Sequence, residues 1–407
     1  MLLCPQLPDP SGIGDSVRSW RMLRHLAGRY RVHLGCFGGS AENRRTEGFI
    51  RQFCHTVFVA HGPPPVLRPS SAGSLFGGAR TPRLPRDVGL HTWVERLWSD
   101  TTPARVLAIS ATMAPYALMP SAGPVRRILD RPDIEPGAWA DPARTGQPLR
   151  RWLQAREVRS LLFIDGRRGP AWDASLVASF SLAESLRAIA PDAAERIQVL
   201  PDGIDVAHFA PPNRPAAPAM PGWRIILLAG GLSGHDAIDG ALWFTAEVLP
   251  LIRAAAPDCR FLLTAADHKL QGAWPEGRGG VTVQTGVTDL RPWMAEAAVV
   301  VAPFLSRQTR PVLEAMAMGR PVVARPGVLD LSDGKPGRDL WVADPPSDFA
   351  EAVLNALDPA LGGAVGRAAR VHVVGTHSWE ARLNQLDAVL EGQTAPANLR
   401  TRSIPLG

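Results

Sequence analysis

Short apolar runs alternate with amphipathic segments along nearly the whole chain, and Gly or Pro residues separate them. This rhythm is typical of parallel sheets, in which a crossover helix joins each strand to the next. It therefore predicts the α/β class. In the first half of the chain we expect strands at Leu2–Cys4, Arg31–Phe37, Thr56–Ala60, Val106–Ser110, Arg126–Leu129, Ala174–Ser179 and Arg196–Leu200.

A proline-rich stretch at residues 210–221 interrupts the pattern, which then begins again. Such a composition is typical of an exposed linker between domains. A long helix is expected at residues 236–255. The remaining expected strands are Arg224–Ala229, Arg260–Thr264, Val281–Thr285, Val299–Pro303 and Pro321–Ala324.

The length of 407 residues suits two doubly wound domains of similar size. We expect a first domain at 1–205 and a second at 206–376. A flexible tail is expected at 392–407. In doubly wound sheets, ligands bind beyond the carboxyl ends of the strands.

The composition excludes several classes of protein. With 45% hydrophobic and 20% charged residues, the chain is neither disordered nor membrane-embedded. A net charge of +6 is a weak field for this length, and no basic run interleaved with aromatics argues for nucleic-acid binding. Four cysteines without C-x-x-C spacing favour free thiols in a reducing compartment. No signal peptide is recognised at the start, so a cytoplasmic location is expected.

Gly12-Ile13-Gly14-Asp15 follows the first expected strand and opens a helix. Glycines at a helix start let backbone amides approach an anion, and Asp15 is placed to cap the helix. The third glycine of a dinucleotide fingerprint is replaced by Val17. The loop is therefore interpreted either as a ligand-facing loop or as a plain turn.

Glu314 is the one carboxylate in an otherwise apolar helix that precedes Gly319 and a strand. Burying a carboxylate is costly unless a partner binds it. A ribose diol is one such partner, because a carboxylate accepts the hydrogens of both hydroxyls. The alternative is an exposed Glu that favours the helix N-terminus.

These segments and several others resemble motifs of family-4 glycosyltransferases with the GT-B fold. The matching segments are Leu200-Pro201-Asp202-Gly203-Ile204-Asp205, the Gly286–Pro292 run G-V-T-D-L-R-P, the Val312–Ala324 run around Glu314, and Ser378-Trp379-Glu380. Gly14-Asp15-Ser16-Val17-Arg18-Ser19 is similar to a motif of a narrower branch, the sugar transferases associated with PEP-CTERM/exosortase polysaccharide loci.

The resemblance implies two Rossmann-like domains facing a central cleft, with a carboxyl-terminal helix at 377–391 that packs back on the first domain. It also implies transfer of a hexose-type sugar from a nucleotide-sugar to a lipid-linked exopolysaccharide acceptor, with retention of configuration. No metal site and no cofactor are implied. By match to the motifs, Glu314 would hold the ribose, Arg310 would neutralise the leaving diphosphate, and the second domain would bind the donor. The implied donor-binding residues are Gly230, Gly231, Gly286, Val287, Thr309, Arg310, Val312, Leu313 and Glu314.

The acceptor side is assigned by the same resemblance to the first domain. Asp133 would orient or deprotonate the acceptor hydroxyl, with Glu135 as the second choice. A basic amphipathic segment at 149–168 is interpreted either as a peripheral membrane contact or as a helix packed on the sheet. The loop residues assigned to the acceptor side are Gly12, Gly14, Asp15 and Arg18.

Several cationic positions of the family are absent. Ile13 and Pro311 occupy positions where the branch has lysines, and Ala266 occupies the position of its arginine after a central strand. Ser306 replaces the family's second glutamate. Arg310 and Arg307 are candidates to compensate, since guanidinium binds phosphate well. A catalytically silent protein that binds a nucleotide-sugar or a partner enzyme is the first alternative. A non-hydrolysing nucleotide-sugar epimerase is the second.

Overall fold

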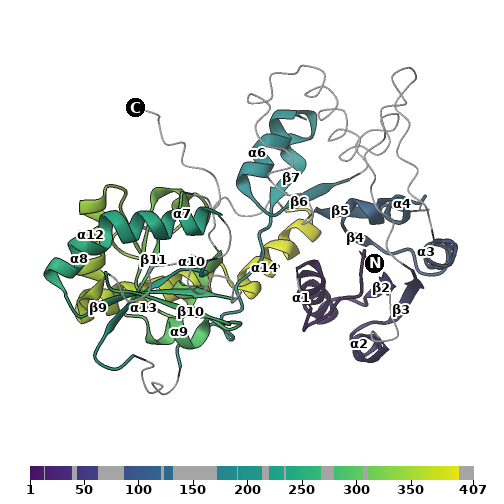
Figure 1. Cartoon of the computed structure of the whole chain (residues 1–407). Coiled ribbons are helices and arrows are strands. Elements are labelled where there is room, and N and C mark those ends of the chain that lie inside the picture. The colour runs from purple at the N-terminus through teal and green to yellow at the C-terminus, as the bar shows by residue number, and fades with distance from the viewer. Residues whose placement is uncertain are drawn as a thin grey trace, which may run out of the picture. The chain divides into compact units, whose positions relative to one another are not determined.

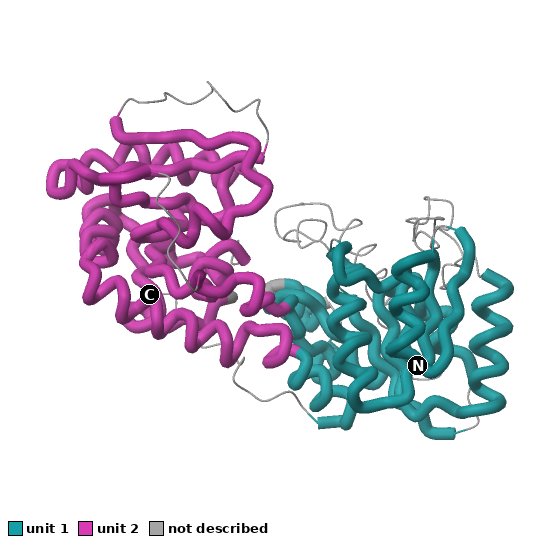
Figure 2. The backbone as a smooth tube through the Cα atoms, turned by 90° about the horizontal axis from the view of Figure 1, so that it is seen from below, with its two compact units in different colours: residues 1–202, 383–407 teal, residues 203–382 magenta. Residues whose placement is uncertain are grey.

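The chain divides into two compact units, coloured separately in Figure 2. Unit 1 comprises Met1–Asp202 and Leu383–Gly407, and unit 2 comprises Gly203–Arg382. The chain crosses into unit 2 after Asp202 and returns to unit 1 after Arg382. Both crossings lie a few residues from the domain bounds expected at 205/206 and 376/377. The computed structural model describes residues 1–12, 14–38, 44–62, 87–120, 123–131, 172–189, 191–212, 220–232, 235–266, 279–305 and 310–393.

Unit 1 contains a seven-stranded parallel sheet in the order β3-β2-β1-β4-β5-β6-β7. Its strands are apolar and largely buried because helices cover the faces of parallel sheets. The strand order reverses at β1, which lies between β2 and β4. The strands are β1 (Leu2–Cys4), β2 (His33–Gly38), β3 (Thr56–His61), β4 (Arg105–Ile109), β5 (Arg126–Arg131), β6 (Ala174–Val177) and β7 (Ile197–Val199).

Helix α1 (Asp15–Ala27) follows β1 and buries Trp20, Leu23 and Leu26, which share one face at helical spacing. The expected cap was wrong in its position. Gly14 is the N-cap, at φ 61°, without a side-chain cap bond, and Asp15 lies in the first turn. The other helices described wholly within unit 1 are α2 (Arg44–Ile50), α3 (Val88–Asp100), α4 (Ala114–Ala117) and α6 (Phe180–Ile189).

Unit 2 contains a six-stranded parallel sheet in the order β10-β9-β8-β11-β12-β13. The strand order reverses at β8, which lies between β9 and β11. This central strand and both its neighbours lie in the apolar core of the unit. The strands are β8 (Arg224–Leu228), β9 (Cys259–Ala265), β10 (Val281–Thr285), β11 (Val299–Ala302), β12 (Val322–Ala324) and β13 (Trp341–Val342).

The helices of unit 2 lie on both faces of its sheet, with α7, α8 and α12 on one side and α9 and α13 on the other (Figure 1). The expected helix at 236–255 is present as α7 (His235–Trp243), a π-helical stretch (Phe244–Val248) and α8 (Leu249–Ala255) in succession. The others are α9 (Arg291–Glu296), α10 (Arg310–Ala317), α11 (Leu329–Ser332), α12 (Pro346–Leu357) and α13 (Pro359–Thr376).

Helix α14 (Trp379–Leu390) carries the chain back into unit 1. Its carboxyl-terminal end is held there by polar bonds. Arg126 Nε donates to the carbonyl of Val389 at 2.7 Å, and His25 Nε2 lies 2.9 Å from Asp387 Oδ1. The carboxyl-terminal part of this helix is therefore bonded to unit 1, although it follows unit 2 in the sequence.

The expected strands all overlap strands of the structure, so the α/β prediction is confirmed. The sheets are both fully parallel and doubly wound, as the alternation predicted. β13 was not predicted, because two residues carry no periodicity. None of the described helices is long and apolar enough to span a bilayer.

Candidate functional site

Most of the predicted donor-binding residues lie near β8, the strand at which the strand order of the unit 2 sheet reverses. β8 lies between β9 and β11, and crevices form at such points beyond the carboxyl ends of the strands. The loop after β8 carries Gly230 and Gly231, and α10 follows β11. The topology therefore places the glycine pair and the Glu314 helix at the same edge of one sheet.

Gly230 and Gly231 adopt left-handed conformations, with φ of 72° and 68°. A Cβ on Gly230 would lie 2.8 Å from Cγ of Pro311, at the start of α10. A Cβ on Gly231 would lie 2.6 Å from the carbonyl oxygen of Thr264, at the end of β9. Glycine is needed here for both reasons, because the turn passes tightly between two neighbouring elements.

The loop after β10 is joined to the end of β9. Val287 N donates to the carbonyl of Ala265 at 3.1 Å, and Gly286 has φ 73°. Arg291 then forms a bidentate pair with Asp289, with Nη2 2.7 Å from Oδ2 and Nε 3.0 Å from Oδ1. The structure thus fixes the predicted base-binding loop at the carboxyl end of the sheet.

Glu314 lies in the middle of α10, and its side chain is only 13% exposed. Arg310 Nε donates to Glu314 Oε1 at 2.9 Å, while the arginine side chain is 62% exposed. Burial raises the pKa of Glu314, and the neighbouring Arg310 partly opposes that shift. A mostly buried carboxylate that is paired with an exposed arginine is suited to accept hydrogen bonds from hydroxyl groups.

Two predicted donor residues of α10 have their side chains in the core rather than at a surface. Val312 is fully buried and Leu313 is 7% exposed. Their side chains therefore belong to the core, and the assignment of both residues to donor binding stays a prediction. Only their backbone amides, in the first turn of the helix, are available to a ligand. Thr309 lies outside the described residues.

The predicted loop of unit 1 follows β1, the strand at which the strand order of that sheet reverses. Gly12 is closely packed, since a Cβ there would lie 2.1 Å from Ser16 Oγ. Gly14 and Asp15 open α1. Asp133 and Glu135 lie outside the described residues, as does the basic segment at 149–168.

Arg18 departs from its predicted place in a ligand-facing loop. Its side chain is 1% exposed, and its guanidinium pairs with Asp130 through Nε and Nη2, each at 2.7 Å. Nη1 reaches Asp202 Oδ1 at 2.7 Å, and Nη2 also donates to the carbonyl of Leu200. Arg18 is thus a buried structural residue, which ties α1 to β5 and to the last residues of unit 1 before the crossing.

Sequence reasoning did not anticipate two neighbours of the site in unit 2. His208 lies 3.2 Å from Arg291, measured from Nδ1 to Nη1. Thr264 is 1% exposed, and its hydroxyl lies against the turn at Gly231. His208 belongs to no local pattern of charge or hydrophobicity, whereas Thr264 was expected only as the last residue of a strand.

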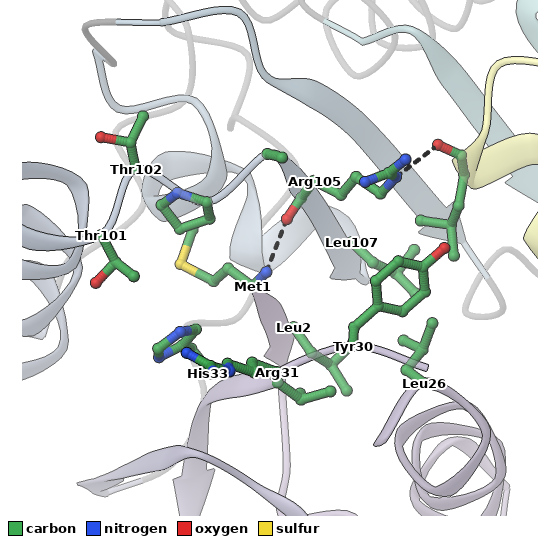
Figure 3. A pocket seen from close by; sticks show the side chains of 14 residues that line it. Met1, Leu2, Leu26, Tyr30, Arg31, His33, Thr101, Thr102, Arg105 and Leu107 are labelled. Atoms are coloured by element: carbon green, nitrogen blue, oxygen red, sulfur yellow. Dashed lines mark hydrogen bonds between the residues drawn. The ribbon is translucent and has the colours of Figure 1, made fainter. Parts of the chain in front are cut away.

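A cavity of about 260 Å³ lies at the opposite, amino-terminal edge of the sheet in unit 1. Figure 3 shows Tyr30, Arg31 and Arg105 around it, near the start of β1. None of the predicted site residues lines this cavity. It is therefore separate from the candidate site.

Comparison with known proteins agrees with this geometry. Residues 224–359, which contain all the predicted donor-binding residues, match the family model described as "Glycosyl transferases group 1". The chain is similar to group 1 glycosyl transferases. A D-inositol 3-phosphate glycosyltransferase from Arthrobacter sp. (strain FB24) is 32% identical over 206 residues, which is 44% of this chain and 47% of the relative. The chain thus spans about half the length of that relative.

Solved structures share the two-domain GT-B fold of glycosyl transferases. A glycosyltransferase from Rickettsia africae has a TM-score of 0.57 at 10% identity, with 96% of this chain and 97% of the other covered. Anabaena HepE, solved with UDP and glucose, has a TM-score of 0.51 at 15% identity, with 96% and 98% covered. These likenesses establish the fold.

Proposed function

We propose that this protein is a glycosyltransferase that uses a nucleotide-sugar donor bound by unit 2. The observation that carries the proposal is the position of Glu314, whose mostly buried carboxylate lies in the helix that follows β11, the neighbour of the central strand β8. The family model spans this region, and a relative of the same fold was solved with UDP and glucose.

The proposed donor contacts divide between two ends of the nucleotide. The Glu314 carboxylate accepts hydrogens from the ribose hydroxyls, and the Gly286–Val287 backbone lies against the base. The turn at Gly230 and Gly231 brings its backbone close to the diphosphate, as glycine allows. Negative charge grows on the diphosphate as the sugar leaves, so a cation fixed beside it stabilises the transition state. Arg310 supplies that cation.

The finer parts of the proposal rest on sequence motifs. We propose retention of configuration, a lipid-linked exopolysaccharide acceptor, and membership of family 4 and of the PEP-CTERM/exosortase-associated branch. Asp133 is proposed to orient the acceptor hydroxyl, with Glu135 beside it in sequence. Peripheral contact with the inner face of the membrane is proposed for the basic segment at 149–168.

A second candidate function is a silent GT-B protein that binds a nucleotide-sugar or a partner glycosyltransferase. The observation favouring it is the start of α10, where the branch's phosphate-facing lysine is replaced by Pro311. The proline ring packs under Gly230, close to where the diphosphate is proposed to bind. Proline offers neither a charge nor a backbone N–H.

Release of nucleoside diphosphate separates these two candidates. Purified protein is incubated with UDP-, GDP-, dTDP- and ADP-sugars, with and without a bacterial polyprenyl-lipid extract. A transferase releases nucleoside diphosphate from one donor faster when the extract is added, and Asp133→Asn lowers that rate while donor binding persists. Saturable donor binding without release under any condition would support the silent protein.

A further inference from the structure

His208 is held in a fixed position beside the candidate donor site. Asp205 Oδ1 accepts from the backbone N–H of Ala207 at 3.2 Å and of His208 at 3.0 Å. Phe209 N donates to the carbonyl of Asp205 at 2.8 Å, and Arg370 binds the carbonyl of Phe209. The turn that carries His208 is therefore closed by hydrogen bonds on both sides, although the imidazole itself is exposed.

Contact with Arg291 determines the tautomer of the His208 ring. Arg291 Nη1 lies 3.2 Å from His208 Nδ1, and a guanidinium can only donate. Nδ1 is therefore the acceptor, and the ring proton is on Nε2. Asp289 holds Arg291 through two guanidinium nitrogens, so the arginine cannot easily turn away from the ring.

The turn of His208 is also bonded to the Glu314 helix, because Arg370 Nη1 donates to the carbonyls of both Phe209 and Ala317, the last residue of α10. The charge of a protonated His208 ring lowers the pKa of Glu314 and that of Asp289. His208 thus lies beside the predicted base-binding loop, on a turn that is bonded to the helix of the predicted ribose-binding carboxylate. All these residues belong to unit 2.

The chemistry of a ribose diol needs both kinds of group. Each hydroxyl donates one hydrogen and still has lone pairs that accept. Glu314 is acceptor-only when ionised, so it satisfies the hydrogens and leaves the lone pairs. A ring N–H beside it satisfies a lone pair, and a 2′-deoxyribose has no hydroxyl for that second contact.

We propose that His208 is a ribose-binding residue that acts with Glu314 and selects ribonucleoside diphosphate-sugars over 2′-deoxy donors such as dTDP-sugars. This inference rests on the proposed function. Arg291 and Asp289 are positioning residues, which hold the Nε2–H tautomer of His208.

The test is calorimetric titration of the full chain with UDP, GDP, and their 2′-deoxy counterparts dUDP and dGDP. The nucleotide that binds wild-type protein is then titrated into His208→Ala, His208→Gln and Arg291→Ala. We expect His208→Ala to weaken the ribonucleotide about fivefold to tenfold, the value of one hydrogen bond, and to leave the deoxy counterpart unchanged. His208→Gln, whose amide N–H replaces Nε2–H, is expected to recover most of the affinity, and Arg291→Ala to lie between.

The outcomes distinguish the two proposals. Loss of binding in Glu314→Ala with no change in His208→Ala, or an equal loss for ribo- and deoxynucleotide, would overturn the role of His208 and leave the donor site standing. Failure of wild-type protein to bind any nucleotide would overturn both. His91→Ala, at a partly exposed histidine of α3 in unit 1, is the matched control and is expected to bind as wild type.

Discussion

Arg310 and Glu314 form an ion pair across one turn of α10, with Nε 2.9 Å from Oε1. The pair is unequal, because the arginine is 62% exposed while the glutamate is 13% exposed. A ribose that binds Glu314 must therefore compete with Arg310 for the same carboxylate. Displacement of Arg310 frees a guanidinium at the start of the helix, where the diphosphate is proposed to bind.

Glu314→Gln is expected to separate binding from stability. Burial raises the pKa of Glu314, so the native carboxyl holds its proton more tightly than the unfolded one. The stability that it contributes is present at low pH and is lost as the pH rises through the unfolded and then the native pKa. The variant should therefore resist urea better than wild type at pH 7, equally near pH 4, and bind the donor at least tenfold more weakly.

Arg310→Gln is expected to weaken interaction with the diphosphate and leave the fold intact. An exposed arginine contributes below about 1 kcal/mol to stability, whereas a charge-assisted bond to phosphate contributes about 1.5–3 kcal/mol. Titration with a nucleotide and with the corresponding nucleoside checks this. Affinity for the nucleotide should fall about tenfold or more, and affinity for the nucleoside should stay the same or rise. Equal effects on both ligands would contradict the assignment.

Asp130→Asn is expected to destabilise the protein by about 3–5 kcal/mol, because it leaves the buried Arg18 guanidinium without its main counter-charge. Asp202→Asn should cost less than about 1 kcal/mol, since that carboxylate is 45% exposed. Urea unfolding of the two variants side by side measures the difference. Similar losses from both would show that Arg18 is not held mainly by Asp130.

Gly231→Ala is expected to be more harmful than Gly337→Ala, although both glycines have positive φ, at 68° and 75°. The left-handed conformation costs an alanine about 1–2 kcal/mol at either position. At Gly337 the new Cβ meets open space, whereas at Gly231 it meets the carbonyl of Thr264. Thermal unfolding should therefore show a larger loss for Gly231→Ala, and only this variant should lose donor affinity.

His377 is expected to make unit 2 sensitive to mild acid. Burial, together with Arg382, lowers the pKa of His377 from 6.5 to about 3, and its ring bonds the carbonyl of Ser332 at 2.9 Å. Its contribution is complete above pH 6.5 and is lost as the pH falls towards 3, by about 1.4 kcal/mol per unit. Urea unfolding at pH 7 and pH 5 should show a smaller pH effect in His377→Gln than in wild type. An unchanged pH effect would exclude this histidine as the cause.

Local pattern predicted the fold well because each strand of a parallel sheet is a short apolar run bounded by breaks. The bounds expected at 205 and 376 came from the resemblance of motifs instead, and the chain crosses between its units after Asp202 and after Arg382. The shift of the helix start from Asp15 to Gly14 as cap is small, and it reflects the left-handed backbone that glycine allows at that point.

The site was less predictable because its partners are far apart in sequence. Arg18 looks like a loop residue, yet it pairs with Asp130 and Asp202, more than a hundred residues away. His208 has no local signal either, since its partner Arg291 lies on another element. Glu314 was identifiable because a carboxylate in an apolar helix is unusual by itself.

Binding of a nucleotide-sugar by unit 2 is most directly measured by calorimetric titration of purified protein with UDP-, GDP-, dTDP- and ADP-sugars. We predict saturable binding of one ribonucleotide donor, and its loss in Glu314→Ala while the protein remains folded. Binding that survives Glu314→Ala, or no binding of any donor by folded wild-type protein, would contradict the account.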